Sequence, residues 1–323
     1  MRLFHSIFSG IAPDSSYPET VIKAAIERSV DGTDPWIRAV SGYKKKLRPA
    51  VVQAIEYVVA MVEAMQPPIV VGPDCYDDDA RLRTFFISKA DMQKILTSDQ
   101  NLANFQREQT VAVPQIFALL AMEKHEKIIF GAELSGDIIL HDVPKTTVSF
   151  ESHRLIDPMG SEHEVRRQLK RRAFDHLLSL ALRRIIIVKS ERVKMEHYRT
   201  LLQSKLNLLQ RGGWGFYDTA MVDHLDIEGI EGQLDKIEAQ LLEFGGDDHM
   251  LEVYLDIVTY VLSRPAEHLW SSKETLIVDR MGIKRSKADS DIPEITIDVI
   301  SNDEGRNLVV SLVALSGVAE KTV

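Results

Sequence analysis

The most regular pattern of apolar positions lies between Ser161 and Gln210, a segment that contains no Gly or Pro. At about 100° per residue, its apolar side chains gather on one helical face. They are Leu169, Ala173, Leu177, Leu180, Ile187, Met195, Tyr198, Leu202, Leu206 and Leu209. Ser161 with Glu164 three residues later forms a capping box, a signature of a helix start. The pattern predicts one long amphipathic helix, which at about 1.5 Å per residue spans roughly 75 Å.

A second apolar pattern follows after a short glycine-containing loop. Its members are Ile227, Ile230, Leu234, Ile237, Leu241 and Phe244. The alternating spacing of three and four residues is that of a heptad seam. We therefore expect an antiparallel helical hairpin that resembles a coiled coil, in which Leu209 faces Ile227 and Leu202 faces Leu234. A further helix is expected from Asp247 or Asp248 to about Leu262.

The other segments have weaker patterns. Helices are expected after Pro18, from Pro49, and over Ala80–Leu96, Asp99–Gln106 and Pro114–Phe130. Strands are expected over Glu133–His141 and Thr146–His153, with residues 142–145 as the turn between them. Further strands are expected over Thr275–Lys284, Ile295–Ile300 and Leu308–Leu315, with a hairpin turn at residues 302–305.

These elements predict a helix-dominated α+β fold. Its parts are a helical N-terminal domain over 1–131, an antiparallel β-sheet from 132–160 and 273–323, and the long helical hairpin over 161–272. In this arrangement the hairpin is an insertion between strands of the mostly antiparallel sheet.

Composition narrows the class of protein. The chain has 323 residues and a formal net charge of −9, which argues against bulk nucleic-acid binding. A single cysteine, Cys75, excludes an internal disulfide and fits a reducing compartment, so we expect a cytoplasmic protein. No apolar run approaches the roughly 20 residues that cross a bilayer. No cofactor is predicted.

The first candidate site is the tip of the helical hairpin, where glycines surround Trp214, Phe216 and Tyr217. Aromatic side chains supply much of the binding energy at the centres of protein interfaces. The three aromatics are therefore a candidate partner-binding patch. The alternative is that they fold back on the hairpin.

The second candidate is a basic segment near the start of the long helix, formed by Arg166, Arg167, Lys170, Arg171 and Arg172. Between Ser161 and Arg211 there are thirteen Lys and Arg against five Asp and Glu. Such a segment can bind an anionic partner, including the phosphates of nucleic acid. The alternative, which we favour, is internal pairing with the acidic residues of the hairpin's return arm.

Arg184 falls inside the apolar face of the long helix. A buried arginine requires a carboxylate partner. The expected hairpin register places Glu252 near it.

A third candidate is a metal site on the polar face of the expected strand pair, with Asp137, His141, Glu151 and His153 as ligands. Two carboxylates and two imidazoles suit a divalent metal with an open position for water. A shift of one residue in register dissolves this cluster.

No catalytic motif is present, so the sequence favours a non-enzymatic scaffold or adaptor. It would bind a protein partner or a second copy of itself through the helical hairpin. One alternative is an enzyme, most concretely a metal-assisted hydrolase with the His141–His153 cluster. A second alternative is a nucleic-acid-binding accessory protein that uses the basic helix.

Overall fold

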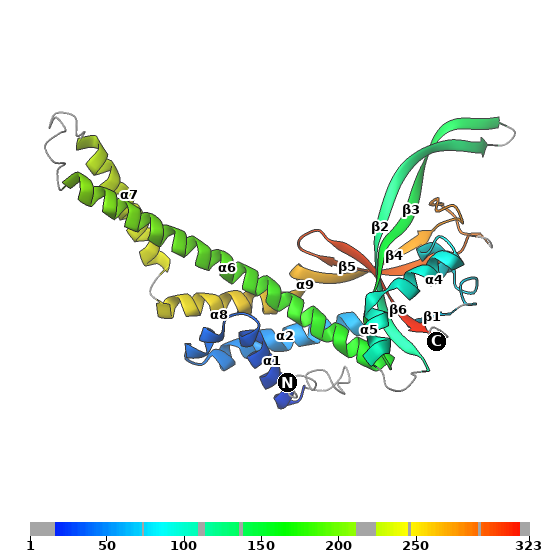
Figure 1. The fold of residues 1–323 in the computed structure, drawn as a ribbon, viewed down its shortest axis with the longest axis horizontal. Helices are drawn as coiled ribbons and strands as arrows, with labels where there is room; N and C mark the ends of the chain where they lie inside the picture. The colour runs from blue at the N-terminus through cyan, green and yellow to red at the C-terminus, as the bar shows by residue number, and fades with distance from the viewer. Residues whose placement is uncertain are drawn as a thin grey trace. The chain divides into compact units, whose positions relative to one another are not determined.

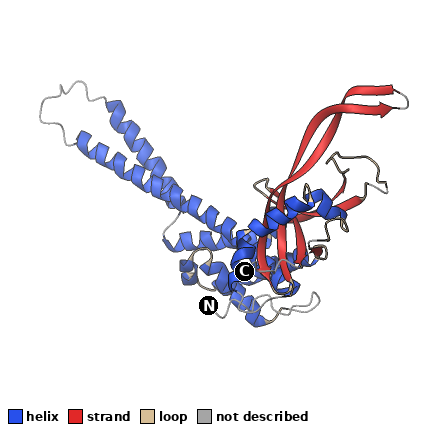
Figure 2. Ribbon diagram, turned by 45° about the vertical axis from the view of Figure 1, so that its right-hand side comes forward, coloured by secondary structure: helices blue, strands red, loops and turns tan. Residues whose placement is uncertain are grey.

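The structure is a computed structural model that describes residues 17–72, 74–108, 114–135, 138–210, 224–244, 247–289 and 292–316. Helices and an antiparallel sheet make up this part of the chain (Figure 2), so the predicted α+β class is confirmed. The helices are α1 (Glu19–Asp31), the 3₁₀ helix η2 (Pro35–Ala39), α2 (Tyr43–Glu63), α3 (Ala80–Phe85), α4 (Lys89–Ser98), α5 (Gln100–Glu108), α6 (Glu162–Gln210), α7 (His224–Phe244), α8 (Asp247–Ser263) and α9 (Pro265–His268). The strands are β1 (Ile69–Val71), β2 (Ile116–Ser135), β3 (Ile138–Met159), β4 (Leu269–Ile277), β5 (Glu294–Asn302) and β6 (Asn307–Leu315).

The chain divides into two compact units. Of the described residues, unit 1 holds 17–54 and Asp175–Arg264, and unit 2 holds Ile55–Phe174 and 265–316. Helices α2 and α6 each contribute residues to both units.

Unit 2 is built on one sheet with the strand order β3-β2-β6-β5-β4, and the short strand β1 pairs in parallel with β6. One face of the sheet, together with α3, α4 and α5, forms a hydrophobic core. Its largest fully buried side chains include Phe86, Leu82, Met92, Leu120 and Leu155. The turn predicted between β5 and β6 is confirmed, and Gly305 within it has a positive φ of 77°.

The helix predicted over Pro114–Phe130 is wrong, because Ile116–Ser135 forms strand β2. Residues 118–122 are all buried, so both faces of β2 are covered there. An uninterrupted apolar run of this kind has no two-residue alternation, so its periodicity does not distinguish a central strand from a buried helix.

The predicted turn at residues 142–145 is also wrong. These residues lie within β3, which pairs with β2 from Ser135↔Ile138 to Phe117↔Met159. The register shifts at three places along this pair, and each shift leaves one extra residue in β3. The extra positions contain Asp142, Ser152 and Asp157, with positive φ values of 59°, 56° and 49°. These are β-bulges, which add twist and curvature to a strand.

Unit 1 contains most of the predicted helical hairpin. One of the two bonds of the predicted capping box is present at its start, where the Glu164 N–H donates to Ser161 Oγ at 3.3 Å. α6 and α7 lie side by side (Figure 1), with Leu202, Ile230, Leu234 and Ile237 buried between them. The long helix stands in the sequence between β3 and β4, as predicted for an insertion between sheet strands.

Candidate interaction site on the helical hairpin

The outer side of α6 exposes large apolar side chains beside the buried seam. Ile187, Leu201 and Leu208 are 56%, 53% and 74% exposed. They share one heptad position, which also includes Lys194. We call these three apolar residues the outer stripe. Leu201 directly precedes the buried seam residue Leu202, so it faces about 100° away from the seam.

Ile186 and Val193 extend the exposed apolar surface, with 53% and 63% exposure. The polar side chains nearby are paired within the helix. Lys194 Nζ lies 2.8 Å from Glu191 Oε1, and Arg192 Nε lies 2.9 Å from Glu196 Oε1. Salt bridges on a rim around an apolar strip are typical of surfaces that bind another protein.

The predicted seam differs from the observed one at Ile187 and Tyr198. Both belong to the predicted apolar face, yet Ile187 is exposed and Tyr198 is 49% exposed, with its hydroxyl donating to Gln233 Oε1 at 3.3 Å. Leu201 and Leu208 lie outside the single apolar face that was predicted, so neither was a predicted site residue. Their spacing of seven residues was the available signal.

The aromatic tip residues Trp214, Phe216 and Tyr217 lie outside the described residues, so their partner-binding role stays a prediction.

Arg166 of the basic segment stabilises the end of α2. Its Nη1 donates to the Val62 carbonyl at 2.7 Å, and its Nη2 donates to the Met65 carbonyl at 3.5 Å. Its Nε also donates to Glu162 at 2.7 Å. The last carbonyls of a helix lack partners within the helix and carry partial negative charge, so a guanidinium stabilises them.

Other cations of this segment also have partners within unit 2. Lys170, which is 5% exposed, pairs with Glu63 of α2. Arg172 pairs with Asp157, the bulge residue of β3. Arg167 lies 4.0 Å from Glu164, and Arg171 is half-buried.

These carboxylates come from α2, β3 and the first turn of α6, and none of the four belongs to the return arm that we expected to supply them. Binding of an anionic partner by the segment remains a prediction.

Arg184 stacks on an aromatic ring. Its guanidinium carbon lies 5.5 Å from the centroid of Tyr260, on which Arg264 also stacks at 4.4 Å. Glu252, the expected partner, forms a salt bridge of 3.6 Å with Lys46. A cation above an aromatic face is attracted to the ring electrons.

The metal-site hypothesis is contradicted by the register of β2 and β3. Glu151 lies opposite Glu123, whereas Asp137 was expected there. His141 and His153 stand on the same strand, about 40 Å apart at about 3.3 Å per residue. Asp137 lies outside the described residues, within which no cluster of three or more potential metal ligands occurs.

His153 is instead part of the packing of unit 2. Its Nε2 lies 2.8 Å from the Phe85 carbonyl, and its ring stacks on Phe86 with 4.8 Å between centroids. Burial lowers the pKa of His153, although the Phe85 carbonyl opposes that effect. The neutral imidazole is therefore favoured in the folded protein.

Within the described ranges, no helix is both long enough and apolar enough to cross a bilayer.

Comparison with known proteins identifies no relative of this chain. The sequence matches no protein-family model, no curated protein and no solved structure.

Proposed function

We propose that this chain is a non-enzymatic cytoplasmic scaffold or adaptor that binds an amphipathic helix along the outer stripe of α6. The helix belongs to a partner protein or to a second copy of the chain. The observation that carries the proposal is the exposure of Ile187, Leu201 and Leu208 at heptad spacing beside a packed helix pair. A third helix buries such a stripe with the same packing that joins α6 to α7.

The aromatic tip belongs to the same proposal as a second contact. Trp214, Phe216 and Tyr217 follow α6 directly in sequence.

Purification from the native host at endogenous expression tests the proposal. The wild type is compared with Leu201→Asp/Leu208→Asp, with Trp214→Ala/Phe216→Ala, and with the matched control Gln203→Asp/Asn207→Asp, whose sites are exposed on the same helix about 100° or more from Leu201 and Leu208. We expect one specific partner, or self-association, to be lost in the stripe variant and retained in the control. Identical co-purifying proteins and identical oligomeric state in all four would contradict the proposal.

A further inference from the structure

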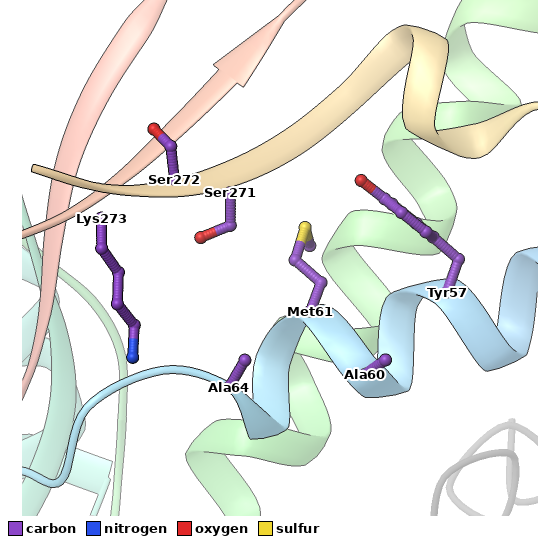
Figure 3. Close-up of a pocket in the computed structure, with 7 residues that line it drawn as sticks. All are labelled: Tyr57, Ala60, Met61, Ala64, Ser271, Ser272 and Lys273. Carbon is purple, nitrogen blue, oxygen red and sulfur yellow. The ribbon is translucent and has the colours of Figure 1, made fainter.

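A second surface, in unit 2, combines an open strand edge with an apolar groove. Among the described strands, β4 is the last of its sheet and pairs with β5. Beside it, helix α2 and β4 enclose a groove of about 220 Å³. Figure 3 shows its lining, which consists of Tyr57, Ala60, Met61, Ala64, Ser271, Ser272 and Lys273. An apolar cavity of about 150 Å³ already holds a benzene-sized molecule, so this groove has room for at least one apolar side chain.

The hydrogen bonds around β4 identify which of its backbone groups face outward. The Asp303 N–H donates to the His268 carbonyl at 3.2 Å, immediately before the β4–β5 ladder that pairs Leu269 with Asn302. Antiparallel pairs alternate between hydrogen-bonded and non-hydrogen-bonded positions. The even-numbered residues of β4 therefore bond to β5, and the odd-numbered residues direct their N–H and C=O groups away from the sheet.

Two bonds at the ends of β4 support this alternation. The Leu269 carbonyl accepts from the Tyr57 hydroxyl at 2.7 Å, and the Ile277 carbonyl accepts from the Arg285 N–H at 2.8 Å. Between these two capped ends, Ser271, Lys273 and Thr275 point their backbone groups to the open edge. Within the described residues, no further strand pairs with them. The edge is thus available over about five residues.

The side chains around this edge provide an apolar surface on α2 and one exposed ammonium group on β4. Ser271 and Lys273 point toward α2, where Ala60 and Ala64 are small and exposed and Met61 forms an apolar floor (Figure 3). Among the described residues no carboxylate lies within salt-bridge distance of the exposed Lys273 ammonium. Its cross-strand neighbour Asp298 is buried, and accepts a hydrogen bond from the Gln66 N–H at 3.0 Å.

We infer that this groove binds an extended peptide segment of a partner protein, which adds to the sheet as a strand beside β4. Backbone bonds to Ser271, Lys273 and Thr275 hold the strand, an apolar side chain enters the groove over Ala60 and Met61, and a carboxylate meets Lys273. Strand addition to an open edge, with pockets for alternate side chains, is a recurrent form of peptide recognition. The site is independent of the outer stripe on α6.

Charge decides between a partner peptide and a second copy of the chain. A symmetric pairing of two β4 edges that uses the whole open window is centred on Lys273, and it places two ammonium groups opposite each other. Like charges directly opposed across strands are destabilising. A lysine in an edge strand also disfavours pairing with neutral strands. The favoured occupant is therefore a strand with an acidic side chain at that position.

Fluorescence anisotropy with a labelled peptide tests the inference on the full chain. The probe is acetyl-Thr-Val-Thr-Glu-Thr-Val-Thr, in which the valines and the glutamate share one face of the strand. Its control carries lysine in place of glutamate. We expect the glutamate peptide to bind at least tenfold more tightly than the lysine peptide, and the variant Lys273→Glu to reverse that order.

Two kinds of variant locate the binding. Thr275→Pro removes an outward N–H while it leaves the β4–β5 bonds in place, and should weaken binding at least tenfold. Ala60→Trp fills the groove from an exposed helix position and should do the same, whereas Gln53→Trp, also exposed on α2, should not. If Thr275→Pro fails to fold, the effect of Ala60→Trp on peptide binding still tests the inference.

Three results would overturn the inference. The first is no binding of the glutamate peptide, and the second is binding that Ala60→Trp leaves unchanged. The third is a wild-type dimer that Thr275→Pro converts to monomer, because the edge would then belong to a second copy.

Discussion

The adjacent leucines Leu201 and Leu202 provide a direct test of how the helical hairpin is held together. Leu202 is 7% exposed and packs with Ile230, Leu234 and Ile237, whereas Leu201 is 53% exposed. Replacing a buried leucine by alanine costs about 2–5 kcal/mol, and the cost is smaller where neighbours relax into the space. Because the cluster is only two helices wide, we expect Leu202→Ala to cost about 2–3 kcal/mol and Leu201→Ala about 0.5 kcal/mol or less.

Hydrogen exchange of α7 measures this difference locally, since exchange reports the free energy of local opening. At about 1.4 kcal/mol per factor of ten, Leu202→Ala should accelerate exchange across residues 224–244 by roughly 30- to 150-fold. Leu201→Ala should change it by less than about threefold. Exchange in β5 and β6 of unit 2 serves as the internal control. Equal acceleration by the two variants would refute the packing described here.

Further predictions concern other positions. Gly229→Ala and Gly232→Ala should each stabilise α7 by about 0.5–1 kcal/mol, because an added Cβ meets no atom within 4 Å; unchanged exchange would contradict this. Burial lowers the pKa of His153, so its contribution is complete above the unfolded pKa near 6.5 and falls as the pH drops below it. Unit 2 should therefore lose more urea stability between pH 7.5 and 5 than the non-titrating His153→Gln variant; equal losses would exclude His153 as the cause. Arg166→Ala should destabilise by about 1.5–3 kcal/mol, because Arg166 bonds the Val62 carbonyl, whereas Arg167→Ala, whose salt bridge measures 4.0 Å, should cost under about 1 kcal/mol. Arg184→Ala should lower the melting temperature more than Arg183→Ala, since Arg184 stacks on Tyr260 and Arg183 is exposed; equal shifts would contradict that.

The sequence predicted the helical hairpin well because two independent signals agreed there. The capping box at Ser161 marked the start of α6, and the seam residues of α7 fell at heptad spacing. A segment of forty-nine residues without Gly or Pro left few alternatives. The same reasoning missed the outer stripe. Leu201 and Leu208 are apolar and exposed, but they lie outside the one apolar face that was predicted for the helix.

The strands were predicted less well for physical reasons. β2 is a central strand whose apolar run lacks alternation. Pro144 resembled a turn residue, but β3 is the last strand in the order of the described sheet, and an edge strand tolerates proline. The outer side of β3 is bridged at Thr147 by Ile283. β4 begins at Leu269, whereas Thr275 was expected. Its first residues were not predicted as a strand, because its exposed edge residues show no apolar alternation. The metal hypothesis failed with the register of that hairpin, on which it depended entirely.

Site-specific photo-crosslinking in the native host tests the proposed interaction surface most directly. A benzophenone amino acid is placed at Leu201 of the outer stripe, and in a separate variant at Gln203, which is exposed about 160° around α6 from Leu201. We predict a discrete crosslinked adduct, to a partner or to a second copy, from position 201 and not from position 203. Equal adducts from both positions, or none from position 201, would contradict the assignment of the outer stripe as an interaction surface.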